Sequence, residues 1–276
     1  MTQDPNTNDY MMVLWYCEHG DLRNYLNRSI DYKTKIRNLS EFARGLLDIH
    51  NAGLVHKDLH SGNLLFTTNN NSGRFYPFIS DLGMSQPANI SKEKSVSKEG
   101  IYGVLPYVAP EVLRGFQYTQ AADIYSFGIV MNEFMSEEMP YNDIPHDHVL
   151  TVKICNGLRP KISEDTPKLL ADLIIKCWDA KPENRPTANE LVKILNRWYD
   201  KEIIDKNSVL YSQVKECEKI RENKLKNKSN EDKSKDLQTH PQAIYTSRLL
   251  NFKNLPKPVN SSDLSPFYSG NILNTI

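Results

Sequence analysis

Hydrophobic residues are grouped unevenly along the first part of the chain. Residues 1–9 are polar, and we expect them to be frayed. An unbroken apolar run follows, Tyr10 to Tyr16, whose length and aromatic residues favour a buried strand over a helix. A polar break at residues 18–20 precedes a helix start at residues 21–26, with an acidic residue in its first turn. Further short strands are predicted at residues 54–55, 64–66 and 75–79, with a polar turn over residues 67–73.

Helical spacing dominates the rest of the folded region. Apolar residues recur every three or four positions over residues 39–47, 124–134 and 169–177. Gly53 stands where a left-handed C-terminal cap would end the first of these helices. Thr187 and Glu190 form a capping-box pattern at the start of a fourth helix, whose apolar stripe runs to Trp198. Residues 85–103 are polar and without period, which predicts a long surface loop.

The composition changes after about residue 200. Residues 201–240 alternate basic and acidic side chains with few large apolar residues between them. Residues 205–226 have the pattern of a solvated helix. Beyond them Asn, Ser, Lys and Pro dominate, so we expect a charged, largely disordered tail over residues 201–276.

The overall charge excludes several classes of function. The chain has 276 residues, and its 34 Lys and Arg balance 34 Asp and Glu. We therefore expect no nucleic-acid partner and no anionic membrane partner. The longest apolar stretch, residues 11–17, is far short of the ~20 residues that span a bilayer. With no secretory signal pattern and four cysteines outside any C-x-x-C pair, a cytoplasmic location without a zinc site is expected.

Two short polar segments carry the candidate chemistry. Asp58 and Asn63 lie in a loop between two apolar strands, where a carboxylate can deprotonate a hydroxyl and an amide oxygen can bind a hard cation. Asp81 directly follows a strand and precedes Leu82-Gly83, a suitable place for a Mg²⁺ ligand. Taken singly, such residues are more often ordinary turn residues. Asp123, at the start of an apolar helix, has an equally plain explanation as a first-turn charge.

The order of five motifs resembles the protein kinase signature. They are H-x-D-x-x-x-x-N at residues 56–63, D-L-G at 81–83, A-P-E at 109–111, D-I-Y-S-F-G at 123–128, and C-W at 177–178 followed by R-P at 185–186. The resemblance covers about residues 10–198, and the wording of the first motif is most similar to the tyrosine-kinase-like branch of serine/threonine kinases. It implies a mostly α fold, a kinase-like large lobe with short β hairpins and a truncated α+β small lobe.

The resemblance implies catalytic roles for the polar residues. Asp58 would accept the proton of the substrate hydroxyl, and Asn63 and Asp81 would hold Mg²⁺ on ATP. Leu82 would pack as an apolar peg, with His56 as a core histidine beside it. Glu111 and Arg185 would form a buried ion pair within the large lobe.

It also implies a nucleotide site around the first apolar run. Leu14 would be the gatekeeper, and the backbones of Trp15 and Cys17 would bond the adenine edge. Asp21 would reach the ribose, and Leu65 would form the floor of the adenine pocket. Because backbone contacts leave no side-chain signature, the alternative that Leu14 and Trp15 are plain core residues stays open.

The sequence departs from the family pattern near the activation loop. Lys57 replaces an Arg, so weaker coupling to a phosphorylated loop is expected. Val104 replaces a Thr whose hydroxyl would bond the catalytic Asp, and His60 replaces a Lys. Ser/Thr acceptors are therefore favoured over Tyr only weakly. The candidate phosphorylation sites in the loop are Ser91, Ser95, Ser97 and Tyr102.

The glycine loop and the strand Lys of the kinase small lobe are not in this sequence, which contains no G-x-G-x-x-G. The expected domains are a small-lobe remnant (1–20), a large lobe (21–200) and the tail (201–276). Without sheet partners, Met11, Val13 and Trp15 would expose an unpaired edge.

Three hypotheses follow from these departures. The first is an ATP- and Mg²⁺-dependent kinase that acts on protein substrates, with a partner protein or upstream sequence supplying the small lobe. The second is a lobe that docks partners without phosphoryl transfer. The third is an incomplete gene product.

Overall fold

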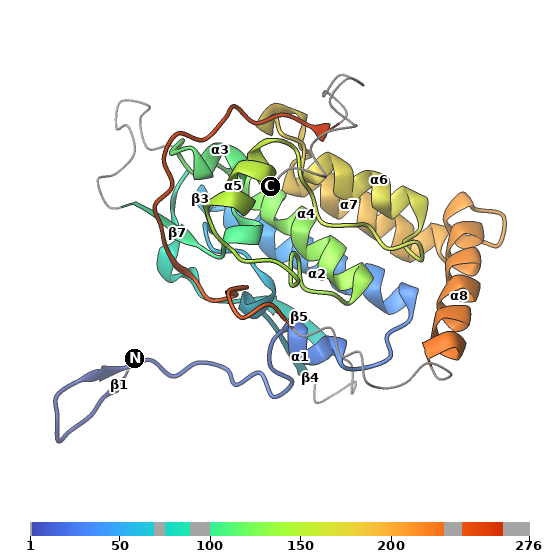
Figure 1. Cartoon of the computed structure of the whole chain (residues 1–276). Helices are drawn as coiled ribbons and strands as arrows, with labels where there is room; N and C mark the ends of the chain where they lie inside the picture. Colours follow the sequence, from blue (N-terminus) through green and yellow to red (C-terminus); the bar gives the residue numbers. More distant parts are fainter. Residues whose placement is uncertain (1, 69–74, 89–99, 229–238, 262–276) are drawn as a thin grey trace.

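The structure is a computed structural model that describes residues 2–68, 75–88, 100–228 and 239–261 (Figure 1). Helices dominate it, and the strands of the described part pair two by two into small antiparallel sheets. The helices are α1 Leu22–Leu26, α2 Tyr32–Asn51, α3 Pro110–Leu113, α4 Gln120–Ser136, α5 His148–Cys155, α6 Lys168–Cys177, α7 Ala188–Arg197 and α8 Val209–Lys228. The paired strands are β1 Thr2–Gln3 with β2 Tyr10–Met11, β3 Leu54–Val55 with β6 Gln86–Pro87, β4 Leu64–Thr68 with β5 Phe75–Ile79, and β7 Ile101–Gly103 with β8 Arg248–Leu250.

The central helix, α4, is the core of the body. Its sequence is apolar on nearly every face, which is typical of a helix buried on all sides. Thr119 caps its start by accepting a hydrogen bond from Ala122 N, and Glu137 ends it in the left-handed conformation. Gly128 lets α6 approach closely, because a Cβ there would meet Cys177 Cβ at 2.7 Å.

The predicted helices are present, and α2 is longer than its apolar signal predicts. Asp31 caps α2 at Thr34 N, so the helix begins well before the apolar residues at 39–47 that signalled it. It ends where Gly53 adopts a φ of +74°, as predicted. The capping box of Thr187 and Glu190 at the start of α7 is confirmed. The predicted loop over residues 85–103 has a short strand near each end, at residues 86–87 and 101–103. Its middle, residues 89–99, lies outside the described residues.

The N-terminal segment departs from the predicted buried strand. Only residues 10–11 of the run form a strand. They pair with β1, so residues 2–3 are not frayed as expected. The segment extends away from the body (Figure 1). Leu14 and Trp15 are 74% and 75% exposed. The expected exposure of Val13 and Trp15 is confirmed, but the expectation of an unpaired edge is wrong at Met11, which pairs with Thr2 of β1 and is 45% exposed.

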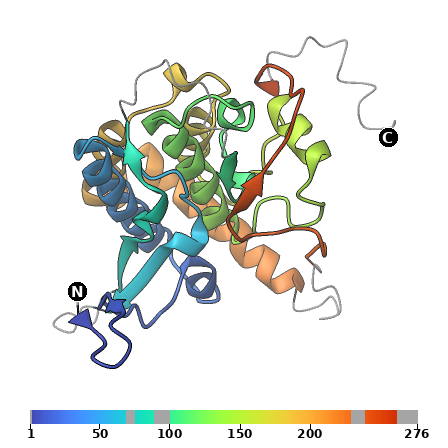
Figure 2. The same cartoon turned by 90° about the vertical axis from the view of Figure 1, so that its left-hand side faces the viewer.

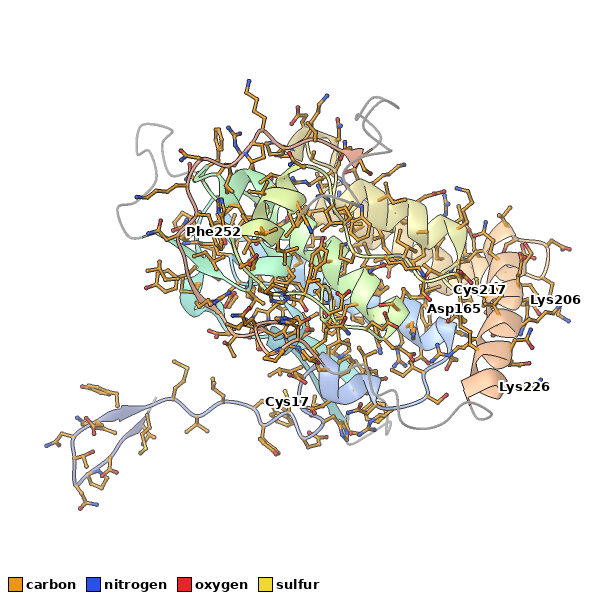
Figure 3. The ribbon with its side chains drawn as sticks, in the orientation of Figure 1. Cys17, Asp165, Lys206, Cys217, Lys226 and Phe252 are labelled. Carbon is orange, nitrogen blue, oxygen red and sulfur yellow. The ribbon has the colours of Figure 1, made fainter. Side chains whose placement is uncertain are left out.

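Helix α8 lies where residues 205–226 predict a solvated helix, but that expectation is wrong for one of its sides, which packs on the body. Leu210, Val214 and Cys217 are buried in the hydrophobic core cluster. Lys224 Nζ lies 2.7 Å from an Asp165 carboxylate oxygen, and Figure 3 shows Asp165 beside Cys217 where α8 meets the body. Hydrophobic and ionic contacts therefore hold α8 in place.

The expectation of a disordered tail is wrong for residues 239–261. This segment, red in Figures 1 and 2, runs along the body. Its Val259 N donates to Cys155 O at 3.0 Å, and Leu250 is 3% exposed within the core cluster. The physical reason is that Leu250 is buried in the core cluster and Tyr245, Phe252 and Leu255 pack against that cluster. Residues 229–238 and 262–276 lie outside the described residues.

Candidate active site

A buried carboxylate of α4 positions the loop that carries Asp58. Asp123, 1% exposed, accepts hydrogen bonds from the backbone N–H of His56 at 2.8 Å and of Lys57 at 3.0 Å. His50 Nε2 donates to the same carboxylate at 3.0 Å. These bonds hold Lys57 at a φ of +73°, a conformation that is strained for a residue with a side chain. Asp123 is therefore an anchor of the loop, not merely a first-turn charge.

Asp58 itself is buried and ionised. Burial raises the pKa of its carboxyl, but the hydrogen bond from His60 and the hydroxyl of Ser247 outweigh burial, so the pKa lies below its usual value. His60 Nε2 stands 3.7 Å from Asp58 Oδ2. His60 Nδ1 accepts a hydrogen bond from Gly62 N, which leaves Nε2–H to face the carboxylate. At neutral pH Asp58 can accept a hydrogen bond from a hydroxyl and, later, its proton.

Hydrogen bonds join Asn63 to Asp58 and to Ser80, the residue before Asp81. Asn63 Nδ2 donates to the backbone oxygen of Asp58 at 2.8 Å. The Asn63 carbonyl in turn accepts from Ser80 N at 2.8 Å and Ser80 Oγ at 3.0 Å. Ser80 directly precedes Asp81, whose left-handed φ of 60° turns the chain after β5. The structure thus brings the two loops of the predicted site together.

An open cavity of about 1270 Å³ lies next to these loops. Its walls include Leu14, Trp15, Cys17 and Leu65 together with Asp81, whereas Asp21, Asp58 and Asn63 are not among its lining residues. Figure 3 shows Cys17 near α1, where the N-terminal segment joins the body. Four residues expected at the adenine and one expected at the metal therefore share one cavity.

Asp21 and Trp15 take part in specific local contacts. Asp21 Oδ1 caps α1 by accepting from Asn24 N at 3.0 Å, and Asp21 bridges to Leu65 in the backbone. Trp15 Nε1 donates to Thr67 Oγ1 at 3.2 Å, and Thr67 Oγ1 donates to Glu18 at 2.6 Å. The alternative of Leu14 and Trp15 as plain core residues is wrong, because both are exposed.

Sequence reasoning missed part of the cavity wall. Thr67, Tyr76 and Phe78 line it beside Leu65. In the β4–β5 hairpin Leu65 pairs with Phe78 and Thr67 with Tyr76. Leu65 and Thr67, like Tyr76 and Phe78, are two positions apart on one strand, so their side chains point to the same face of the hairpin. This alternation is the sequence signal that could have identified them.

The residues around the two loops follow prediction in part. His56 is fully buried; its Nδ1 accepts from Asp58 N and its Nε2 donates to Ser80 O at 3.0 Å, as expected of a core histidine. The expectation that Leu82 packs as an apolar peg is wrong, because its side chain is 51% exposed on the cavity wall. No described element covers that side of the cavity closely enough to bury it.

The activation-loop region is only partly described. Ser91, Ser95 and Ser97 lie outside the described residues, and Tyr102 is 44% exposed on β7. The Lys57 ammonium lies 5.3 Å from the centre of the Tyr118 ring, a cation–π distance. Val104 is buried.

Polar side chains form a buried network under the Asp58 loop. Arg23 Nε donates to Ser61 Oγ at 2.9 Å, Ser61 Oγ lies 3.1 Å from Tyr107 Oη, and Tyr107 Oη donates to Glu133 at 2.6 Å. Burial raises the pKa of Glu133 despite the hydrogen bonds from Tyr107 and Ser61. The protonated form of Glu133 is thus favoured by folding.

This network predicts a pH dependence of stability. A carboxyl whose folded pKa is raised stabilises most below its unfolded pKa of ~4.3, and that stability falls as pH rises through the folded pKa. Glu133→Gln, which resembles the protonated acid, is expected to lose less stability than the wild type between about pH 5 and about pH 8. Urea midpoints at both pH values measure this. Parallel losses in the two proteins would show that Glu133 does not titrate in the folded range.

Comparison with known proteins decides the family. Residues 2–195 match the family described as protein tyrosine and serine/threonine kinase. The chain belongs to the protein kinase family. The kinase motifs quoted above all lie within the matched region, and the mostly helical body with small sheets is consistent with a kinase fold. None of the helices in the described ranges is long and apolar enough to cross a membrane.

Relatives of this kinase chain carry related names. A probable serine/threonine-protein kinase, roco8, of Dictyostelium discoideum is 30% identical over 208 residues, covering 71% of this chain and 11% of the relative. A protein kinase and PP2C-like domain-containing protein of Arabidopsis thaliana is 32% identical over 219 residues, covering 67% of this chain and 32% of the relative. The probable serine/threonine-protein kinase gdt2 of D. discoideum is 31% identical over 206 residues, 72% of this chain and 12% of the relative. The chain thus spans a third or less of each.

Proposed function

We propose that the protein transfers the γ-phosphoryl group of ATP to Ser and Thr hydroxyls of proteins, with Tyr a less favoured acceptor. The observation that carries this proposal is the hydrogen-bonded link between the Asp58–Asn63 loop and the Ser80–Asp81 turn, beside an open cavity. The names of the relatives support the choice of Ser and Thr.

Asp58 is the proposed catalytic base. Its lowered pKa keeps it ionised at neutral pH, so it can orient the attacking hydroxyl by accepting its hydrogen bond. The proton passes to the Asp58 carboxylate as the oxygen–phosphorus bond forms. Asp123 is a positioning residue that holds the loop for this role.

Asn63 and Asp81 are the proposed ligands of Mg²⁺. The described residues contain no group of three or more His, Cys, Asp or Glu side chains that could hold a metal by themselves. Two protein ligands, Asn63 and Asp81, fit Mg²⁺, because this ion is commonly bound by one or two protein oxygens while phosphate and water oxygens complete its shell. Asn63 Nδ2 already donates to Asp58 O, so its amide oxygen is the atom left for a cation. When bound, the ion neutralises charge on the transferred phosphoryl group.

The adenine is proposed to bind in the cavity. Leu65 would form its floor, and the backbones of Trp15 and Cys17 would bond its edge, with Leu14 as the gatekeeper. Asp21 would reach the ribose with the oxygen that does not cap α1. A cavity of about 1270 Å³ exceeds the common range for small-molecule sites, as a site lacking one wall would.

The missing wall is the kinase small lobe. We infer that residues 1–20 are the last strand and hinge of that lobe, that residues 21–200 are the large lobe, and that the glycine loop and strand Lys come from outside this chain. The exposed residues 12–16 support this, because a sheet partner would bury them.

Nucleotide binding provides a test of the site. With Mg²⁺ and ATP at about 100 times its Kd, the protein expressed from its complete reading frame is expected to gain about 2.7 kcal/mol of stability, seen as a rise in Tm of several degrees. Asp81→Asn is expected to remove most of this shift, whereas Asp200→Asn, exposed in the turn after α7, leaves it unchanged. Equal shifts in all three proteins would exclude Asp81 as a metal ligand.

A second candidate function is a lobe that binds partners without phosphoryl transfer. The exposed apolar residues 12–16 favour it, because an exposed apolar patch is typical of a surface that binds a partner. It predicts no thermal shift with Mg²⁺ and ATP. The retention of Asp58, Asn63 and Asp81 in linked positions counts against it, since docking alone does not need them.

A further inference from the structure

The C-terminal segment crosses directly over the Asp58 loop. Its strand β8 pairs antiparallel with β7, with Arg248 opposite Gly103 and Leu250 opposite Ile101 (Figures 1 and 2). Gly103 adjoins the candidate base, because a Cβ on Gly103 would lie 3.9 Å from Asp58 Oδ1. The pairing therefore carries the residues just before Arg248 to the Asp58 carboxylate.

Ser247 is the residue that reaches it. It directly precedes Arg248, which pairs with Gly103 beside Asp58, and its hydroxyl is one of the polar groups that hold the pKa of the Asp58 carboxyl down. Phosphoryl transfer requires the acceptor hydroxyl to lie beside the catalytic base. Ser247 has this position relative to Asp58, the proposed base.

Contacts on the N-terminal side of Ser247 hold the segment in place. Arg23 Nη2 donates to Tyr245 O at 3.3 Å, and the Arg23 guanidinium lies 5.2 Å from the centre of the Tyr245 ring. Tyr245 Oη donates to Pro140 O at 2.9 Å, and the ring packs edge-on against His146 at 4.9 Å. The backbone of Ile244 also hydrogen-bonds to His146.

Contacts on the C-terminal side are equally specific. Arg248 Nη2 donates to His146 O at 2.6 Å, and Leu250 is 3% exposed. Phe252 lies 5.9 Å from the His148 ring at the start of α5 (Figure 3). Backbone pairing with side-chain anchors on both flanks is how proteins bind extended peptides along a strand edge. The segment thus lies across the candidate site as a bound peptide would.

We propose that Ser247 is a phosphorylation site and that residues 244–250 are an intramolecular substrate of this kinase site. This inference rests on the proposed function. Ser247 Oγ forms the new bond to the γ-phosphorus of ATP, the bond from that phosphorus to the β,γ-bridging oxygen breaks, and ADP leaves; Asp58 takes the hydroxyl proton. Phosphate on Ser247 then faces the Asp58 carboxylate, and like-charge repulsion releases the segment. By the same contacts, outside substrates are expected to be extended peptides with an aromatic residue two before the acceptor and a basic residue after it.

Site-resolved mass spectrometry tests this proposal. The complete protein, first treated with phosphatase, is incubated with Mg²⁺ and ATP at several protein concentrations, with casein added as an outside substrate. Phosphate is expected on Ser247 with a rate constant independent of protein concentration. Ser247→Ala is expected to remove that site, whereas Thr246→Ala at the neighbouring hydroxyl leaves the rate of Ser247 labelling unchanged.

Casein reports on release of the segment. The wild type is expected to show a lag in casein labelling that ends as Ser247 becomes phosphorylated, and Ser247→Ala is expected to stay slow. Tyr245→Ala, which removes the anchor on Arg23 and Pro140, is expected to raise the initial casein rate several-fold.

The outcomes separate the two proposals. Asp58-dependent labelling of casein without phosphate on Ser247, and with no change in Tyr245→Ala, would overturn the intramolecular substrate and leave the kinase activity standing. Absence of label on both casein and Ser247 would overturn the proposed function and this inference with it. Labelling of Ser247 that accelerates with protein concentration would overturn the intramolecular step.

Discussion

Asp58→Asn is expected to lower the kcat of phosphoryl transfer by the complete protein by roughly 10²- to 10⁴-fold, the usual contribution of a catalytic base. The amide has nearly the size of the carboxylate but cannot accept the hydroxyl proton. The backbone oxygen of residue 58 still accepts from Asn63 Nδ2, so the loop should keep its place. Initial rates at saturating Mg²⁺–ATP measure the effect, and the KM for ATP is expected to change little because Asp58 does not line the nucleotide cavity.

A matched control separates this effect from a general loss of charge. Asp172→Asn removes a half-exposed carboxylate paired with Lys168 on α6, away from the site, and should leave kcat unchanged. Thermal unfolding of both variants shows whether the fold is intact. A folded Asp58→Asn protein with wild-type kcat would mean that another group serves as base.

Arg185→Ala is expected to destabilise the protein by about 3–5 kcal/mol. Arg185 meets Glu111 in a two-point pair, with Nη1–Oε1 at 2.7 Å and Nη2–Oε2 at 2.8 Å. The guanidinium also donates to Ala121 O at 2.9 Å and to Asp179 O at 2.8 Å. Removing it leaves the mostly buried Glu111 carboxylate and two carbonyls without these partners. The resulting loss of folding free energy exceeds the contribution of any single hydrogen bond.

Urea unfolding of Arg185→Ala beside Arg197→Ala measures the effect. Arg197 is 63% exposed and pairs with Glu202, so its loss is expected to change stability by no more than about 1 kcal/mol. Arg185→Lys keeps the charge but not the two-point geometry, and an intermediate loss is expected. Equal, small losses in Arg185→Ala and Arg197→Ala would contradict a buried structural pair.

Local signals predicted the elements whose stabilising contacts are close in sequence. The capping box at Thr187 and Glu190 identified the start of α7, and strand β5 at Phe75–Ile79 was predicted with its observed bounds. Strand β8 was missed because Arg248–Leu250 is too short to be recognised alone and gains its structure from distant β7. Helix α5 was missed because its start signal, Asp147 capping Leu150 N, precedes a segment with little helical period.

The same distinction applies to the candidate site. The order of the motifs identified Asp58, Asn63 and Asp81, and the structure links their loops. The role of Asp123 could not be read from the sequence, because its partners are backbone N–H groups. The apolar run at residues 10–16 predicts a buried strand yet is exposed, because a pattern of hydrophobic residues cannot show whether a partner covers them.

The most direct test of a protein kinase site in this chain is transfer of label from γ-labelled ATP to casein by the protein expressed from its complete reading frame. Label is expected on Ser and Thr of casein, and it should disappear with EDTA and fall by roughly 10²- to 10⁴-fold in Asp58→Asn. Wild-type labelling no greater than that of Asp58→Asn would contradict the proposed function and favour a lobe that only binds partners.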